Sequence, residues 1–331
     1  MKVAPQLPPR VTIVSPALAA ANNGNWHTAS RWQRFLAPVA SVNVASDWTD
    51  GDDSELLIAL HARRSAAAIA RWRELRPEAP LVLVLTGTDL YRDLDHDPCA
   101  RHSLECASRI VVLQEAGLVR LDVVARAKAI VIVQSASALA VKRTPADPDF
   151  AAVGHLREEK DPRTLMRAAR SLDADGRAPI TIVHIGAGLD AALADAARAT
   201  MRDGPADRWL GPLSHAAARR AIASARALVH MSRMEGGANV VIEAVRSGVP
   251  VLASDIDGNV GLLGTGYDGY FPVGDAAALA ALMRRFIDDA AFARHLASQC
   301  AEREPLFRPA AERNAVRTMV LDLVVASAAR R

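Results

Sequence analysis

Apolar and polar positions follow two rhythms that alternate along the whole chain. Short runs rich in valine, isoleucine and leucine are followed by alanine- and arginine-rich stretches. In those stretches apolar residues recur every three or four positions, as at Trp32, Phe35, Leu36 and Val39. The first pattern is typical of buried strands and the second of amphipathic helices. The alternation predicts an α/β protein in which helices cover parallel sheets.

The predicted elements are distributed over both halves of the sequence. Strands are expected at 11–14, 42–45, 56–60, 81–85, 110–113 and 129–133, and then at 150–153, 180–185, 227–230 and 249–253. Helices are expected at 28–36, 162–171, 214–224, 238–247 and 275–287.

The chain of 331 residues is long enough for two domains, because one hydrophobic core rarely exceeds about 250 to 300 residues. The segment KRTPADPDF, residues 142–150, combines two prolines with charge and lacks periodicity, which is typical of a linker. We therefore predict an N-terminal domain over 1–146 and a second domain over 147–308. The amphipathic segment 309–331 is expected to form a helix that packs back on the first domain.

Composition excludes several classes of protein. The net charge is only +3 and is spread along the chain, so duplex nucleic acid is not an expected partner. No apolar run is long enough to cross a membrane, and the N-terminus lacks the apolar core of a secretion signal. Three scattered cysteines fit a reducing compartment. We expect a cytoplasmic protein with no membrane partner, and the sequence predicts no oligomeric state.

The segment SRMEGGANVVIEAVRSGVPVLASD, residues 232–255, carries the most chemistry. Gly236 and Gly237 leave backbone N–H groups accessible before a predicted helix, whose N-terminus carries partial positive charge. Glu235 would lie at the mouth of this anion site. Glu243 would lie about a turn and a half inside the helix, where a carboxylate can accept both hydroxyls of a ribose. Packing glycines and a solvated helix face would also explain these residues.

The same segment resembles the donor-site signature of the retaining, family 4-like glycosyltransferases of GT-B fold. Upstream, VGHLREEKDPRTLMRAA resembles that family's GRLxxxKG segment, and IVHIGAG resembles its VGxG strand end. The similarity covers about 150–300 in order. It implies two Rossmann-like domains facing a central cleft, and a nucleotide-sugar donor.

The resemblance also implies a role for each matching residue. Glu243 would hold the ribose, Glu235 would meet the transferred sugar and Lys160 would neutralise the diphosphate. His155 stands where the family has arginine, so Arg157 is expected to supply the missing charge. With fixed positive groups there, no divalent metal and no other cofactor is expected. The expected donor site comprises Gly24, Asn25, His155, Arg157, Lys160, Glu235, Gly236, Gly237, Ala238, Asn239 and Glu243.

In the first half, NNGNWHTASRWQRFLA, LLIALHARRSAAAI and LVLVLTGTDLYRDL resemble the selenosugar synthases of selenoneine biosynthesis. These glycosyltransferases join a UDP-sugar to selenophosphate. The resemblance implies UDP-GlcNAc or UDP-glucose as donor, selenophosphate as acceptor and a 1-selenosugar with a C–Se bond as product.

Selenophosphate is already anionic and strongly nucleophilic, so its site needs cations more than a general base. Because ligands of parallel sheets bind beyond the carboxyl ends of the strands, we take the acceptor residues from there. They are Asn22, His27, His61, Arg63, Arg64 and Arg92. His61 is the leading one, because it follows a buried-looking strand. Asp89, in TGTD, is expected to orient a cation or contact the sugar. The expected catalytic residues are Lys160, Glu235, His61 and Asp89.

The turn NNGN, residues 22–25, is expected to serve the same chemistry. Gly24 would let the backbone approach a ligand, and the asparagine amides would donate hydrogen bonds at the mouth of the next helix. A turn that merely caps that helix is the simpler alternative. Surface salt bridges are likewise the simpler explanation for any single arginine above.

Other interpretations stay open at this stage. The cluster DLDHDPC, residues 93–99, could be taken for a metal site, but it follows a polar loop and mixes hard and soft ligands, so no metal is expected. An ordinary glycosyltransferase with a hydroxyl acceptor, a UDP-sugar epimerase and a UDP-sugar-binding protein are the alternative functions.

Overall fold

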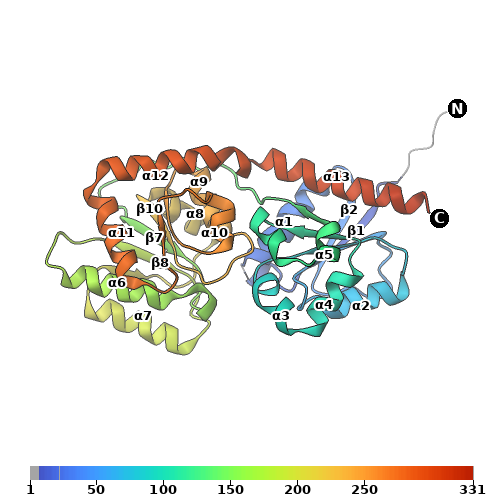
Figure 1. Cartoon of the computed structure of the whole chain (residues 1–331), viewed down its shortest axis with the longest axis horizontal. Coiled ribbons are helices and arrows are strands. Elements are labelled where there is room, and N and C mark those ends of the chain that lie inside the picture. Colours follow the sequence, from blue (N-terminus) through green and yellow to red (C-terminus); the bar gives the residue numbers. More distant parts are fainter. Residues whose placement is uncertain (1–6, 22, 331) are drawn as a thin grey trace. The chain divides into compact units, whose positions relative to one another are not determined.

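The computed structural model describes residues 7–21 and 23–330, which form two compact units. The first unit takes its residues from Met1–Gln134 and Pro309–Arg331, and the second is Ser135–Arg308. Within the described residues, each unit contains a six-stranded parallel sheet with helices packed on it (Figure 1). The predicted α/β class with parallel sheets is confirmed.

The sheet of the first unit has the strand order β2-β1-β3-β4-β5-β6. The strands are β1 (Arg10–Val14), β2 (Ser41–Ala45), β3 (Leu56–Leu60), β4 (Leu81–Val84), β5 (Arg109–Val112) and β6 (Ala129–Val131). The helices of this unit are α1 (Gly24–Leu36), α2 (Ala66–Leu75), α3 (Leu94–His96), α4 (Pro98–Cys106), α5 (Val123–Ala127) and α13 (Pro309–Ala328).

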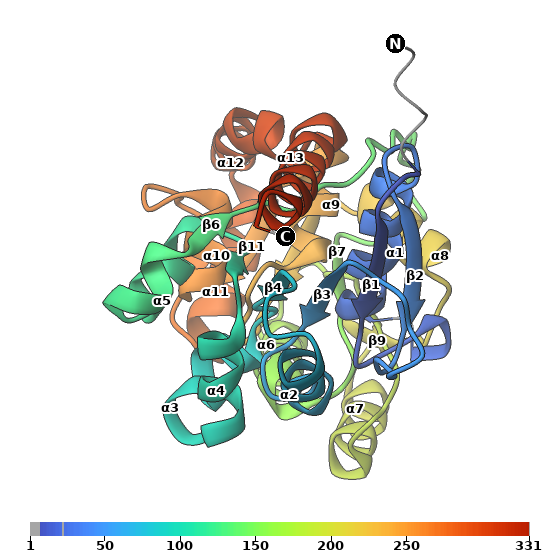
Figure 2. The same cartoon turned by 90° about the vertical axis from the view of Figure 1, so that its right-hand side faces the viewer.

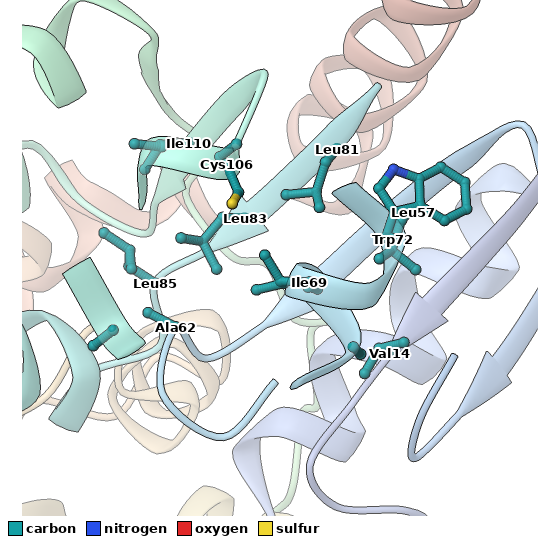
Figure 3. Close-up of a cluster of buried hydrophobic side chains, with 14 of the residues drawn as sticks. Val14, Leu57, Ala62, Ile69, Trp72, Leu81, Leu83, Leu85, Cys106 and Ile110 are labelled. Atoms are coloured by element: carbon teal, nitrogen blue, oxygen red, sulfur yellow. The ribbon is translucent and has the colours of Figure 1, made fainter. Parts of the chain in front are cut away.

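Both faces of this sheet are buried. Leu57 and Leu83 point to one face, where they pack with Ile69 and Trp72 of α2 (Figure 3). Their strand neighbours point to the other face, which α1 and α13 cover. Figure 2 shows α13 and α2 on opposite sides of β3 and β4. Because side chains alternate along a strand, covering both faces requires the unbroken apolar runs seen in the sequence.

The sheet of the second unit has the strand order β12-β11-β10-β7-β8-β9. The strands are β7 (Phe150–Val153), β8 (Ile182–Ile185), β9 (Asp207–Trp209), β10 (Ala227–His230), β11 (Val251–Ser254) and β12 (Tyr270–Phe271). The helices are α6 (Pro162–Ala174), α7 (Ala191–Asp203), α8 (His215–Ser224), α9 (Asn239–Arg246), α10 (Asp257–Leu263), α11 (Ala276–Asp288) and α12 (Ala290–Arg303).

The division of the chain lies earlier than predicted. The second unit begins at Ser135, so the segment 142–150 belongs to that unit and is not an interdomain linker. Arg143 donates from Nε to the carbonyl of Ser224 at 2.7 Å, which fastens this segment to the end of α8. The prolines and charges correctly predicted an irregular segment before β7, but they could not show that this segment packs on the rest of the second unit. The C-terminal segment forms α13, which belongs to the first unit and contacts α1.

Asp207, at the start of β9, is a buried acid outside any predicted site. It is only 1% exposed, and neither carboxyl oxygen has a hydrogen-bond partner among the described residues. Burial, together with the nearby charge of Asp173, raises the pKa of Asp207 to about 7. The folded protein therefore holds a proton here that the unfolded chain releases at lower pH.

Replacing Asp207 with asparagine should remove this proton linkage. Because the folded pKa is raised, the wild type loses stability as pH rises from the unfolded value of 3.8 toward 7. The stability of Asp207→Asn relative to wild type should therefore increase by about 3 kcal/mol between pH 5 and pH 8. Urea unfolding at both pH values measures this difference. A difference that does not change with pH would contradict the account.

Candidate active site

Two loops meet at the carboxyl edge of the second sheet. One follows β7 and runs through Lys160, and the other follows β10 and runs through Glu235. Because β7 and β10 are neighbouring strands, their loops emerge side by side. The backbone N–H of Arg233 donates to the carbonyl of Glu159 at 2.9 Å and ties the loops together. The structure thus brings two separated sequence motifs into one site.

Lys160 and Glu235 form an ion pair across these loops. Their side chains are 25% and 11% exposed, so the pair is largely withdrawn from solvent. Ser232 donates from Oγ to Glu235 Oε1 at 2.7 Å, and His230 Nε2 lies 3.2 Å from the same serine oxygen. Since the serine has one proton and gives it to the carboxylate, His230 must donate to Ser232. The result is a chain of hydrogen bonds that ends on Glu235.

Glu235 is held as an anion. Burial alone would raise its pKa, but the charge of Lys160 and the interaction with His230 together hold the pKa well below the usual range of a glutamate. A permanently ionised carboxylate suits a role opposite developing positive charge, such as that on the anomeric carbon of a sugar.

His155 offers a neutral donor in the same loop. Its Nδ1 accepts the backbone N–H of Ala187 at 3.0 Å, so the neutral ring carries its proton on Nε2. Burial, with the charges of Arg157 and Lys160, lowers the pKa of His155 and favours this neutral form. The histidine therefore does not replace the charge of the family arginine. That Arg157 supplies this charge stays a prediction; its Nη1 lies 3.7 Å from the carboxylate of Glu159.

The N-terminus of α9 lies directly beyond Glu235. Gly236 and Gly237 precede the helix, Ala238 occupies the cap position without a capping side chain, and Asn239 is the first helical residue. The N-terminus of an α-helix carries partial positive charge, which favours an anion beside it. Gly236, Gly237, Ala238 and Asn239 thus lie where the sequence predicted them.

Among the described residues, Glu243 makes no hydrogen bond or ion pair with Lys160 or Glu235. It lies in α9, is 6% exposed and accepts from His215 Nε2, with 2.6 Å between Nε2 and Oε1. Arg219 Nε lies 3.9 Å from the same oxygen. The prediction that three side chains converge is therefore confirmed for only two of them. His215, at the start of α8, supplies a partner for Glu243 that sequence reasoning missed.

In the first unit, His61 follows β3 and is 2% exposed. Its φ of 74° lies in the left-handed region, which is strained for a residue other than glycine. Nδ1 accepts the N–H of Arg64 at 3.3 Å, and Nε2 lies 3.0 Å from Thr88 Oγ1. Burial is the main reason that the pKa of His61 is lowered. His61 is therefore a neutral, fully hydrogen-bonded ring and not the cation that was predicted.

Asp89 binds the backbone of two neighbouring loops. It is completely buried, and its carboxylate accepts the backbone N–H groups of Ala62 at 3.0 Å, Thr86 at 2.9 Å and Gly87 at 2.8 Å. These contacts join the loops after β3 and β4. Asp89 orders the backbone around His61, and its Oδ2 lies 4.0 Å from Nδ1 of that histidine.

The predicted acceptor arginines do gather near His61, but two of them are paired. Arg63 Nε and Arg92 Nε lie 2.8 Å and 3.1 Å from the carboxylate of Asp93. Arg64 is exposed, and no side-chain partner is found for it among the described residues. Asp97, in the cluster once considered for a metal, caps α4 by accepting the N–H groups of Cys99 and Ala100.

The asparagine turn is a helix cap. Asn22 lies outside the described residues. Asn23 Oδ1 accepts the N–H of Trp26 at 3.2 Å, and α1 begins at Gly24 instead of residue 28. Gly24, Asn25 and His27 therefore lie in the first turns of α1 and not in an open loop. The simpler alternative was correct for Asn23, because asparagine is a favoured cap residue.

Comparison with protein families bears on the second unit. Residues 140–303 match the family model described as "Glycosyl transferases group 1". These residues form a domain of the glycosyl transferases group 1 family. Compared with curated proteins, the sequence has no significant match. Among the described residues, no helix combines the length and apolar character needed to span a membrane.

Solved glycosyltransferase structures share the fold of the whole chain. Sucrose-phosphate synthase from Thermosynechococcus elongatus is 17% identical, with a TM-score of 0.78 over 96% of this chain and 100% of that one. Anabaena HepE in complex with UDP-glucose is 15% identical, with a TM-score of 0.73 over 95% and 99%. Trehalose 6-phosphate synthase from Burkholderia multivorans is 13% identical, with a TM-score of 0.65 over 83% and 71%. The GT-B fold class is confirmed.

The Lys160–Glu235 pair makes a stability prediction. Lys160→Ala leaves the buried anion without its cation and should destabilise the protein by about 2 kcal/mol at pH 7. The double variant Lys160→Ala/Glu235→Gln also removes the negative charge of Glu235, and it should recover most of the stability that Lys160→Ala loses. Because the pKa of Glu235 is lowered, the stability from the pair is present above the unfolded value of 4.5 and is lost as pH falls below it.

Urea unfolding at pH 7 and pH 3.5 measures both effects. The difference in the free energy of unfolding between wild type and Lys160→Ala should be smaller at pH 3.5 than at pH 7. Equal stability of the single and double variants at pH 7 would show that the two side chains are not coupled.

Proposed function

We propose that this glycosyltransferase transfers a sugar from UDP-GlcNAc or UDP-glucose to selenophosphate and so forms a 1-selenosugar. The donor half of the proposal depends most on one observation. An ion-paired Lys160 and an ionised Glu235 lie beside the N-terminus of α9, inside the matched family region. Anabaena HepE, which shares the fold, has been solved with UDP-glucose.

In the proposed donor complex, Lys160 and the backbone N–H groups at the start of α9 neutralise the diphosphate. His155 contributes its neutral Nε2–H, and Arg157 contributes the second charge. Glu243 accepts the hydroxyls of the ribose in exchange for its contact with His215. Charge develops on the leaving phosphate during the reaction, and these fixed groups stabilise it without a divalent cation.

The acceptor half is supported by what surrounds His61. Both nitrogens of that ring are in hydrogen bonds, Asp89 accepts three backbone N–H groups, and Asp93 is paired with two arginines. None of these three groups is free to remove a proton. A hydroxyl acceptor needs such a base, whereas selenophosphate arrives ionised. Arg64, exposed and unpartnered in the described residues, is the cation we assign to it.

The reaction balances without a redox partner. Selenium of selenophosphate attacks the anomeric carbon, the C–Se bond forms, and the bond between that carbon and the phosphate oxygen breaks. The electron pair of the broken bond leaves with UDP. Hydrolysis of the Se–P bond by water then releases phosphate and leaves the 1-selenosugar.

Incubation with UDP-GlcNAc or UDP-glucose and selenophosphate should release UDP and yield a selenium-containing sugar by mass spectrometry. Activity should persist in excess EDTA, since the proposed site uses lysine and backbone groups. Glu235→Gln should abolish turnover yet still bind UDP. UDP release without selenium in the product would favour a hydroxyl acceptor, and donor conversion without any acceptor would favour an epimerase.

Arg64→Met tests the acceptor assignment within the same assay. It should raise KM for selenophosphate about tenfold, the loss expected for a charge-assisted contact, and leave UDP affinity unchanged. Arg34→Met is the matched control, because Arg34 is also exposed and has no partner among the described residues. Equal effects of the two variants would remove Arg64 from the acceptor site.

A further inference from the structure

Asp161 directly follows Lys160 and has an unusual backbone. Its φ of 47° and ψ of 51° place it in the left-handed region, where an aspartate is strained relative to glycine. The family segment GRLxxxKG has glycine at this position. Here the side chain is retained and is 2% exposed, so something in the surroundings maintains a conformation that glycine would adopt at lower cost.

The carboxylate of Asp161 is the centre of a small network. Thr164 donates from Oγ1 to Asp161 Oδ2 at 2.8 Å, inside the first turn of α6. Arg233 Nη2 lies 3.2 Å from the same oxygen, and it comes from the loop after β10. The pair therefore spans the same two loops as Lys160 and Glu235.

The contacts between these loops follow one another in sequence. Glu159 accepts the backbone N–H of Arg233, Lys160 pairs with Glu235, and Asp161 pairs with Arg233. Three consecutive residues of one loop are thus bound to a three-residue stretch of the other. Because Asp161 directly follows Lys160 and Arg233 lies two residues before Glu235, a backbone shift of either loop would change the separation of Lys160 and Glu235.

We propose that Asp161 and Arg233 are positioning residues for the donor site. Their ion pair holds the loop of Lys160 against the loop of Glu235, so that Lys160 and the N-terminus of α9 can bind the same diphosphate. The proposal rests on the proposed function, because it assigns these residues to the nucleotide diphosphate of that reaction.

The ion pair between Asp161 and Arg233 adds too little to the free energy of unfolding to explain the strained backbone of Asp161. The Arg233 side chain is 48% exposed, and ion pairs of that exposure contribute about 0–1 kcal/mol. A left-handed residue other than glycine costs about 1–3 kcal/mol. The cost of the strained backbone thus exceeds what the ion pair adds to the free energy of unfolding. Strained backbone of this kind is typical of functional sites.

The experiment compares UDP affinity by calorimetry in wild type, Arg233→Met, Asp161→Asn and the double variant. Asparagine tolerates the left-handed region and keeps an oxygen for Thr164, so it removes the charge alone. Each single variant should bind UDP about fivefold to tenfold more weakly. The double variant should be no weaker than the weaker single one, because the two residues act as a pair. Arg233→Lys, which keeps the charge, should restore most of the affinity.

Arg170→Met is the matched control. Arg170 is 43% exposed and pairs with Asp203 at 3.1 Å in the same unit, so it is a similar ion pair away from the loops. It should leave UDP affinity within twofold, and all variants should unfold within about 2 °C of wild type because such pairs add little stability. Unchanged affinity in Arg233→Met, or losses that multiply in the double variant, would overturn the positioning role. Wild type that binds no UDP would instead overturn the proposed function and this inference with it.

Discussion

The proposed donor site depends on a buried carboxylate that is kept ionised by one lysine. Glu235 is the end of a hydrogen-bond chain from His230 through Ser232, and Lys160 supplies the charge that makes its ionisation favourable. Removing a carboxylate from water is costly unless a partner compensates. The two loops after β7 and β10 are therefore held together by the same interaction that prepares the site, and their other contacts surround it.

The two units carry opposite kinds of chemistry at their strand ends. In the second unit, the strand ends carry hydrogen-bond donors suited to an anion: Lys160, which is paired with Glu235, the neutral ring of His155 and the start of α9. In the first unit, most charges are already balanced. Asp89 binds backbone amides around His61 and Asp93 pairs with Arg63 and Arg92, so that within the described part of the chain Arg64 is the arginine of that group without a side-chain partner. The proposed acceptor, selenophosphate, brings its own negative charge and its own nucleophile and therefore needs no base from this group of residues.

The sequence predicted the strands well because both faces of each sheet are covered, which requires runs of apolar residues. The run 56–60 and the run 227–230 match their strands at both ends. Motifs predicted Lys160 and Glu235 because their spacing belongs to a known signature. The partners of these side chains were harder to predict, because no local sequence pattern indicates contacts between distant residues. Examples are the contacts of Asp93 with Arg63, of His215 with Glu243 and of Asp89 with three backbone amides. The cap on α1 was equally hard to foresee, because capping and ligand binding use the same residue type. A ligand-binding role of the asparagine turn stays a prediction. That the two sheet edges share a cleft stays a prediction.

The central claim is that Lys160, Glu235 and the N-terminus of α9 form the site of a nucleotide diphosphate. A crystal structure with bound UDP tests it most directly. We expect the phosphate oxygens within hydrogen-bond distance of Lys160 Nζ and of the backbone N–H groups between Gly236 and Asn239, with Lys160 turned from Glu235 toward the phosphates. UDP bound away from these groups, with Lys160 still paired to Glu235, would contradict the account.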